Sequence, residues 1–231
     1  MALKKIQRDR QEGSNELVET RQRLLEAAGE VFAEHGFRLA SVREICRRAG
    51  ANVAGVNYHF GDKQRLYAEV LRFAHACAVP IEELRKVLQA PVSAPEKLGL
   101  FVHHFVQSIL ASGQPAWAGR LMAREMVEPT EALDEIVQQQ IRPKFGVLRE
   151  LVATILNVPV EHESVRWYAA SVIAQCLFWH NNRAIIERLY PDLREQPSYI
   201  EFLAGHIARF SLGGLLQAGK ELERYRNRER A

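Results

Sequence analysis

The 231-residue chain has few cysteines and no long apolar run. Its three cysteines, Cys46, Cys77 and Cys176, lie far apart and form no Cys-x-x-Cys pair, as expected of buried thiols in a reducing cytosol. No uninterrupted hydrophobic stretch reaches the length that spans a membrane, and Met1 to Glu19 lacks the apolar core of a signal peptide. We therefore expect a cytoplasmic protein with no membrane partner.

Excess charge and catalytic motifs are also missing. A formal net charge of +3 is too small for non-specific electrostatics to dominate, so any affinity for nucleic acid must come from locally placed cations. There is no nucleophile elbow, Walker loop or dinucleotide fingerprint, and the adjacent His103 and His104 have no His-x-x-x-His or Glu-x-x-His partner. We predict no catalytic residue, metal or cofactor. A helical enzyme is the alternative, which a stoichiometric metal ion would favour.

Two short helical patterns lie close together in the first third of the chain. Their apolar positions repeat at i, i+3 and i+7 on either side of a break at Gly50-Ala51-Asn52. These positions are Val42, Ile45 and Ala49 in the first pattern and Val53, Val56 and Phe60 in the second. Helices this short must pack together as a helix-turn-helix, the unit that lays its second helix in the major groove of DNA.

A helical pattern lies on each side of this motif. The first has Thr20 as the predicted N-cap and stops at Gly36, and the second has Asp62 as the predicted N-cap. Their apolar positions are Leu24, Ala28, Val31 and Phe32 in the first and Leu66, Val70, Phe73 and Cys77 in the second. Nothing here predicts a strand, so the expected fold class is all-α, with a three-helix DNA-binding domain followed by a larger helical domain.

The helical angle predicts which residues of the second motif helix face DNA. If Val53, Val56 and Phe60 are buried, then Ala54, Gly55, Tyr58 and His59 point outward, and Asn57 lies beside the buried edge. Small residues allow the backbone to approach base edges and thymine methyl groups, whereas tyrosine and histidine suit phosphate oxygens.

Basic and capping residues surround this face. Arg43 can reach a guanine as a bidentate donor, Ser41 can hold a phosphate, and Lys63 begins the next helix. Arg47 and Arg48 add charge, although a solvated surface explains any one basic residue taken alone. The predicted DNA-binding residues are Ser41, Arg43, Asn52, Ala54, Gly55, Asn57, Tyr58, His59 and Lys63.

Several motifs in this region resemble the N-terminal domain of the TetR family of transcriptional regulators. They include residues 32–37 (FAEHGF), 41–45 (SVREI) and 58–63 (YHFGDK). The resemblance implies an all-helical homodimer that binds a palindromic operator and a small effector, and it places Arg43, Gly55, Tyr58, His59 and Lys63 at positions that usually meet DNA. Two residues depart from the family pattern, which commonly has an aromatic residue at Asn57 and threonine at Gly55.

The remainder of the chain predicts a second helical domain. Residues 120–125 (RLMARE), Pro129, Ala132 and residues 141–143 (IRP) resemble the effector domain of the CecR-type subgroup. We expect a flexible basic arm over 1–19, the DNA-binding domain over 20–66 and the effector-binding and dimerisation domain over 67–231, with the structural boundary within the fourth helix, near Cys77 to Pro80. The expected helices are 62–88, 95–112, 115–128, 130–156, 161–181, 183–189 and 197–224, with breaks at Pro80 and Pro143.

Two of these helices have the character of a dimer interface. No charged side chain occurs from Trp167 to Asn182, and the last helix combines aromatic residues with a pair of glycines. The predicted interface residues are Val172, Cys176, Trp179, Phe202, Phe210, Gly213 and Gly214. The alternative is a hairpin fully buried in one core.

The effector site is predicted from large or polar side chains on apolar helices. The candidates are His103, His104, Trp117, Arg120, Met122, Arg124, Glu125, Gln175 and Trp179. An inward-pointing Arg120 or Arg124 favours an anionic or polar effector. The predicted function is a regulator, by family habit a repressor, that a small molecule releases from a palindromic operator. An architectural DNA-binding protein without an effector is the alternative.

Overall fold

The computed structural model is helical and free of strands throughout the residues it describes, in agreement with the predicted all-α class. It describes the backbone of residues 2–78, 80–110, 115–193 and 198–229, and the side chains of 16–75, 80–110, 115–193 and 198–228. The chain forms two compact units, one of Met1–His75 with Gln114–Val137 and the other of Ala76–Gly113 with Gln138–Ala231. The side chain of Cys77 lies outside the described residues.

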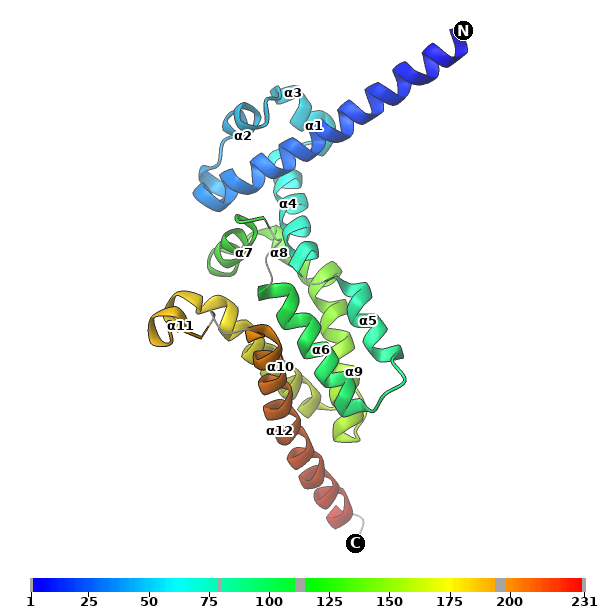
Figure 1. The fold of residues 1–231 in the computed structure, drawn as a ribbon, viewed down its shortest axis with the longest axis vertical. Helices are drawn as coiled ribbons and strands as arrows, with labels where there is room; N and C mark the ends of the chain where they lie inside the picture. Colours follow the sequence, from blue (N-terminus) through cyan, green and yellow to red (C-terminus); the bar gives the residue numbers. More distant parts are fainter. Residues whose placement is uncertain (1, 79, 111–114, 194–197, 230–231) are drawn as a thin grey trace. The chain divides into compact units, whose positions relative to one another are not determined.

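The N-terminal unit contains the helix-turn-helix and the helices that support it (Figure 1). Its helices are α1 (Ala2–Leu39), α2 (Val42–Ala49), α3 (Val53–Phe60), α4 (Lys63–Ala78), α7 (Ala118–Val127) and α8 (Glu131–Ile136). The edge of the Tyr67 ring faces the Phe32 ring, with centroids 4.8 Å apart, and both side chains are fully buried. Helices α1 and α4 therefore share one aromatic core.

Helix α1 differs from its prediction at one end. The predicted stop is confirmed, because Gly36 breaks the helical backbone with φ 72° and ψ 172°, a combination that a side chain disfavours. The predicted start is wrong, because α1 continues through Thr20 back to Ala2. The Thr20 hydroxyl accepts a hydrogen bond from Arg23 (3.1 Å) within the helix. The arm assigned to residues 1–19 stays a prediction.

Helices α7 and α8 belong to the N-terminal unit, whereas the predicted division placed them in the domain 67–231. The indole of Trp117 lies directly over Gly29 of α1, where a Cβ atom would collide with the ring. Leu121 and Ile136 are also buried. Helix α7 and the Trp117 side chain that precedes it thus pack on α1, which explains why this segment folds with the helix-turn-helix.

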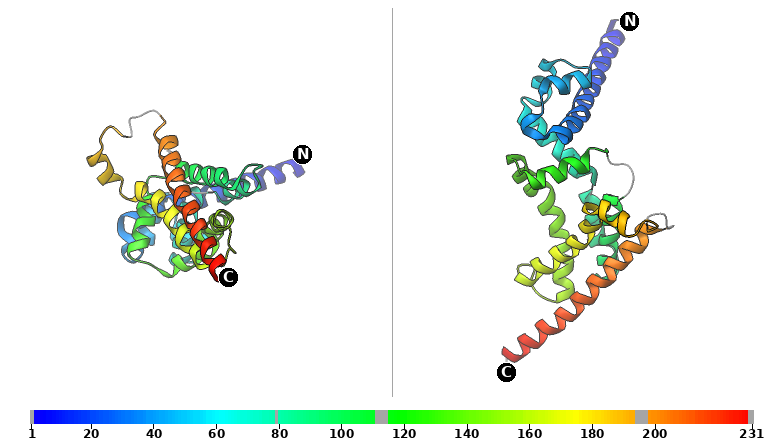
Figure 2. Two further views of the ribbon diagram at one scale, coloured as in Figure 1. Left: turned by 90° about the horizontal axis from the view of Figure 1, so that it is seen from below. Right: turned by 90° about the vertical axis from the view of Figure 1, so that its left-hand side faces the viewer.

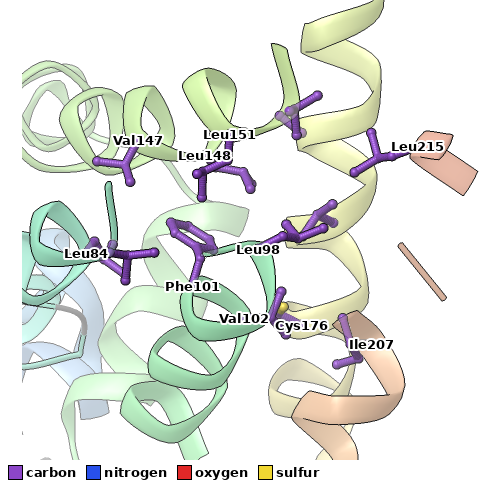
Figure 3. Close-up of a cluster of buried hydrophobic side chains, with 14 of the residues drawn as sticks. Leu84, Leu98, Phe101, Val102, Val147, Leu148, Leu151, Cys176, Ile207 and Leu215 are labelled. Atoms are coloured by element: carbon purple, nitrogen blue, oxygen red, sulfur yellow. The ribbon is translucent and has the colours of Figure 1, made fainter. Parts of the chain in front are cut away.

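The C-terminal unit is a bundle around one apolar core (Figure 3). Its elements are α5 (Ile81–Gln89), α6 (Ala94–Leu110), the π-helical turn η1 (Val137–Ile141) at the unit boundary, α9 (Arg142–Leu156), α10 (Glu163–Asn181), α11 (Arg183–Leu189) and α12 (Tyr199–Glu229). Phe101 of α6 and Leu148 of α9 point toward one another in the centre of this core. Helices α10 and α12 pack side by side (Figures 1 and 2).

Both prolines expected to interrupt helices do so. Helix α4 ends at Ala78, and Pro80 is the N-cap of α5, so the predicted helix 62–88 is split. Pro143 lies in the first turn of α9, directly after the π-helical turn, where its missing N–H is tolerated. No described helix is both long enough and apolar enough to cross a membrane.

Candidate nucleic-acid interface

Backbone and side-chain hydrogen bonds hold the turn between α2 and α3. Gly50 ends α2 in the left-handed conformation (φ 62°), and the Arg23 guanidinium donates to the Ala49 carbonyl (3.2 Å). The Cys46 thiol donates to the Asn52 carbonyl (3.4 Å). The Asn52 side chain caps α3 by accepting a hydrogen bond from the Gly55 amide (2.8 Å). The Gly55 amide also donates to the Asn52 carbonyl (3.0 Å).

The exposed face of α3 differs from the predicted one. Val56 and Phe60 are buried as expected, but Val53 is 45% exposed, so its predicted role as a buried anchor is wrong. At the last residue of α3, the Arg21 guanidinium of α1 lies 5.1 Å from the Phe60 ring. Val53 is the first residue of α3, and the buried positions of the helix begin one turn later, at Val56. The burial pattern of a helix is least regular at such an open end.

The outward face of α3 consists of Val53, Ala54, Asn57 and Tyr58. Compared with the prediction, it is turned by about 100°, one residue along the helix. Asn57, expected beside the buried edge, is exposed, while Gly55 and His59 are only partly exposed. Tyr58 is 73% exposed, and its ring meets the edge of His59 at a centroid distance of 4.9 Å.

The three arginines of α2 differ in their partners. Arg48 pairs with Glu34 (2.7 Å) and Glu44 (2.9 Å), and Arg47 also pairs with Glu44 (2.7 Å). Hydrogen bonds from these two arginines lower the pKa of Glu44 to about 2, and those from Glu34 and Glu44 raise the pKa of Arg48. Arg43 is exposed and has no ion pair within the part of the chain that the structure describes. Its charge is therefore the least neutralised of the three.

Ser41 and Lys63 lie at two helix starts. Ser41 is the N-cap of α2, as predicted, but its hydroxyl makes no capping bond and stays exposed. Lys63 is the first residue of α4, as predicted; its ammonium donates to the Arg38 carbonyl (3.3 Å) and lies 4.8 Å from the Phe37 ring. Burial lowers the pKa of Lys63. The predicted cap at Asp62 is confirmed by its bond from the Arg65 amide (2.8 Å).

A buried carboxylate that the sequence analysis lists among the effector candidates connects three helices of the N-terminal unit. Glu125 of α7 is fully buried and accepts hydrogen bonds from the Tyr67 hydroxyl (2.6 Å), the Thr130 amide (2.8 Å) and the Thr130 hydroxyl (2.9 Å). Burial and the neighbouring Glu125 raise the pKa of Tyr67. The network ties α4 to α7 and to the start of α8.

The other predicted effector residues do not surround one described cavity. Trp117 is buried between Gly29 and Phe73, so it packs in the core of the N-terminal unit. Gln175 donates to the Ser211 hydroxyl (3.0 Å) and links α10 to α12. Hollows of about 600 and 190 Å³ occur in the C-terminal unit; they are lined by residues 150–160 of α9 and its following loop and by parts of α10 and α12. Neither contains a predicted effector residue.

Of the predicted dimer residues, Val172 and Cys176 are wrong as interface residues, because both are buried in the core of their own unit. Burial raises the pKa of the Cys176 thiol to about 12. Phe202, Phe210, Gly213 and Gly214 are exposed, and Trp179 is partly exposed. Helix α10 also exposes Trp167 and Phe178, which are not among the predicted interface residues. Both lie in the uncharged stretch from Trp167 to Asn182, which is the signal that could have identified them.

These features define a helix-turn-helix protein with a separate helical C-terminal unit. A family model described as bacterial regulatory proteins, tetR family, matches residues 24–70. A second, described as the C-terminal domain of the HTH-type transcriptional dual regulator CecR, matches residues 94–215, more than half of the chain. The chain therefore belongs to the TetR family of transcriptional regulators and has a CecR-type C-terminal domain, which confirms the resemblance seen in the sequence.

Individual relatives agree with this assignment. The chain is 28% identical to CecR from Shigella flexneri, in a match that covers 58% of this chain and 64% of CecR. It is 29% identical to UidR from Escherichia coli K12, in a match that covers 58% of this chain and 63% of UidR. The matched part thus spans less than two thirds of these curated relatives. A transcriptional regulator from Pseudomonas aeruginosa PAO1 matches with TM-score 0.65, 22% identity and coverage of 87% of this chain and 92% of that one. FadR from Bacillus subtilis, solved with stearoyl-CoA, matches with TM-score 0.62, 16% identity and coverage of 84% and 98%. At these identities the structures share the fold.

Proposed function

We propose that the protein regulates transcription by binding a palindromic operator as a homodimer. The observation that carries this proposal is the exposed face of α3, which is free of charged side chains, with the unneutralised Arg43 on α2. Arginine can bind a phosphate or a guanine, and a short uncharged helix fits the major groove. The proposed contact residues are Ser41, Arg43, Asn52, Val53, Ala54, Gly55, Asn57, Tyr58, His59 and Lys63.

The homodimer is supported by the outward sides of α10 and α12. Trp167 is 70%, Phe202 67% and Phe210 69% exposed on two helices that pack side by side. Large exposed apolar areas are typical of interaction sites, and a two-fold axis would pair these helices as a four-helix interface. Two copies of α3 would then meet two half-sites about 34 Å apart, as a palindrome requires.

A small-molecule effector is the second part of the proposal. FadR from Bacillus subtilis, which shares the fold, was solved in complex with stearoyl-CoA. In this chain the C-terminal unit is the proposed receptor, and His103, His104, Gln175 and Trp179 are the candidates that lie in it. Binding that favours one conformation of the dimer would change operator affinity through a coupling of about 1–3 kcal/mol. Release of a repressor is the expected direction, and the cytoplasm is the expected compartment.

The decisive experiment is selection of bound fragments from the source genome with the purified full-length protein, followed by band-shift titration of the recovered site. We expect a palindrome bound by one dimer. Recovery of no preferred sequence would contradict the proposal.

A thermal-shift screen of small molecules, with hits added to the band shift, tests the effector. A hit that stabilises the protein and leaves operator affinity unchanged would exclude that compound as the regulatory effector.

A further inference from the structure

The exposed face of α3 has a chemistry that favours one kind of base pair. None of the residues from Val53 to Phe60 is charged. The commonest specific contact in the major groove is arginine or lysine with guanine O6 and N7, and α3 cannot make it. Apart from the Tyr58 hydroxyl and the partly exposed His59 ring, the exposed groups of this helix that suit base edges are methyl groups and one amide.

Val53 and Ala54 supply the methyl groups. Val53 is 45% exposed at the start of α3. Ala54 next to it is also exposed. The only methyl group on a base edge in the major groove is the C5-methyl of thymine, so an apolar helix start fits a thymine.

Asn57 supplies the amide. It lies one turn after Val53, on the same side of the helix, and it is exposed. Its backbone carbonyl accepts a bond from the Gly61 amide (3.0 Å), but within the described residues its side chain makes no hydrogen bond. The carboxamide oxygen and NH₂ group match adenine N6–H and N7, the pairing that asparagine makes in the major groove.

We propose that α3 reads A·T base pairs, with Val53 and Ala54 against thymine methyl groups and Asn57 in a bidentate pair with an adenine. This inference rests on the proposed function and adds the base specificity of each half-site. Arg43 lies on α2, so in this proposal it contacts a base or a phosphate at the positions that flank the α3 contacts. The A·T preference therefore applies to the base pairs beneath α3 and not to the flanking ones. Tyr58, at the edge of the exposed face, meets phosphate and adds affinity without selectivity.

Modified bases test each contact in the selected operator. Deoxyuridine in place of thymine removes only the C5-methyl, and 7-deazaadenine in place of adenine removes only N7. We expect each replacement beneath α3 to weaken binding of the full-length protein by about five-fold or more in each half-site. The same replacements at flanking positions are the matched controls and should change affinity by less than about two-fold.

Protein variants connect each effect to its residue. Asn57→Ala should weaken operator binding and abolish sensitivity to 7-deazaadenine, whereas Val53→Ala should abolish much of the sensitivity to deoxyuridine. Both positions are exposed, so the fold should persist, which circular dichroism checks. Tyr58→Phe should leave both sensitivities intact.

The outcomes separate this inference from the proposed function. A palindrome with G·C pairs beneath α3, or an A·T core insensitive to both modified bases, would overturn the base assignment and leave the regulator intact. Modified-base effects that survive in Asn57→Ala and Val53→Ala would overturn it in the same way. Selection that recovers no preferred site would overturn both proposals.

Discussion

The two units of the chain both have apolar cores, but they differ in how far polar contacts connect their helices. In the N-terminal unit, directional polar contacts connect the helices: Glu125 with Tyr67 and Thr130, and Arg48 with Glu34. In the C-terminal unit, the helices meet mainly through aliphatic and aromatic side chains (Figure 3). Polar contacts are fewer in its core: Lys144 and Ser211 are the buried polar side chains among its described residues, and Ser211 accepts the hydrogen bond from Gln175 that links α10 to α12.

This difference matches the two tasks proposed for the units. A hydrogen bond weakens steeply when its angle changes, so a network of such bonds preserves one arrangement of helices. Apolar packing has no preferred direction and tolerates repacking when total volume is conserved. The first property suits a surface that must match base edges, and the second suits a body that must adjust around a ligand. Each prediction below alters one side of this comparison.

The largest effect is expected from the buried carboxylate. Glu125→Ala removes the acceptor for three hydrogen bonds; it leaves the Tyr67 hydroxyl buried, and the Thr130 amide partly buried, without this acceptor. Urea unfolding should show a loss of about 3–4 kcal/mol. Glu128→Ala, an exposed neighbour on the same segment, is the control and should cost less than about 0.5 kcal/mol. An equally small loss at Glu125 would mean that the N-terminal unit does not depend on this network.

The next effect concerns the outward side of the C-terminal unit. The double variant Phe202→Ala/Phe210→Ala removes two exposed rings of α12 and should weaken the dimer by about 2–3 kcal/mol, measured by analytical ultracentrifugation. The protomer should remain folded, because neither ring belongs to the core. Tyr225→Ala, which removes an equally exposed ring nearer the end of α12, should leave the dimer unchanged. A variant that stays dimeric at wild-type affinity would place the interface elsewhere.

Much of the N-terminal unit was predictable because its signals are local. Asp62, predicted as an N-cap, caps the start of α4, and Gly36 and Gly50, predicted at a helix stop and a helix break, adopt positive φ there. Each of these features depends on residues within one turn of the chain. The same locality made the bounds of α2 and α3 and the break at Pro80 predictable.

The remaining features depend on contacts between distant segments. Val53 fits the apolar spacing of α3, but whether a neighbour covers the first turn of a helix is a tertiary property. Tyr67 and Glu125 are 58 positions apart in the sequence, so no pattern of helical length could predict that they form a hydrogen bond. Val172 and Cys176 show a related ambiguity: an uncharged helix has two apolar sides, and its sequence does not say which one faces its own core.

A smaller effect is expected on the DNA-facing side. Arg43→Ala should weaken operator binding about ten-fold or more and make the salt dependence less steep, because an unneutralised cation near phosphate is lost. Arg47→Ala is the matched control, since Arg47 lies on the same helix and its charge is neutralised by Glu44 at 2.7 Å. It should change affinity by less than about three-fold. Equal losses in both variants would show that ion pairing does not separate the two arginines.

The smallest effect tests the polar exception in the C-terminal core. Burial lowers the pKa of Lys144 to about 8 from a usual 10.5, so the folded chain releases this proton before the unfolded chain does. Below pH 8 the folded and unfolded states both keep the Lys144 proton, so the cost of burying the charge does not change with pH. Between pH 8 and 10.5 the unfolded state binds more protons than the folded state, so the free energy of unfolding rises with pH. From about pH 7.5 to 9, the wild type should gain about 1 kcal/mol relative to Lys144→Met in urea unfolding. Parallel pH profiles for the two proteins would mean that Lys144 keeps an ordinary pKa, and that the C-terminal core tolerates a charged amine without penalty.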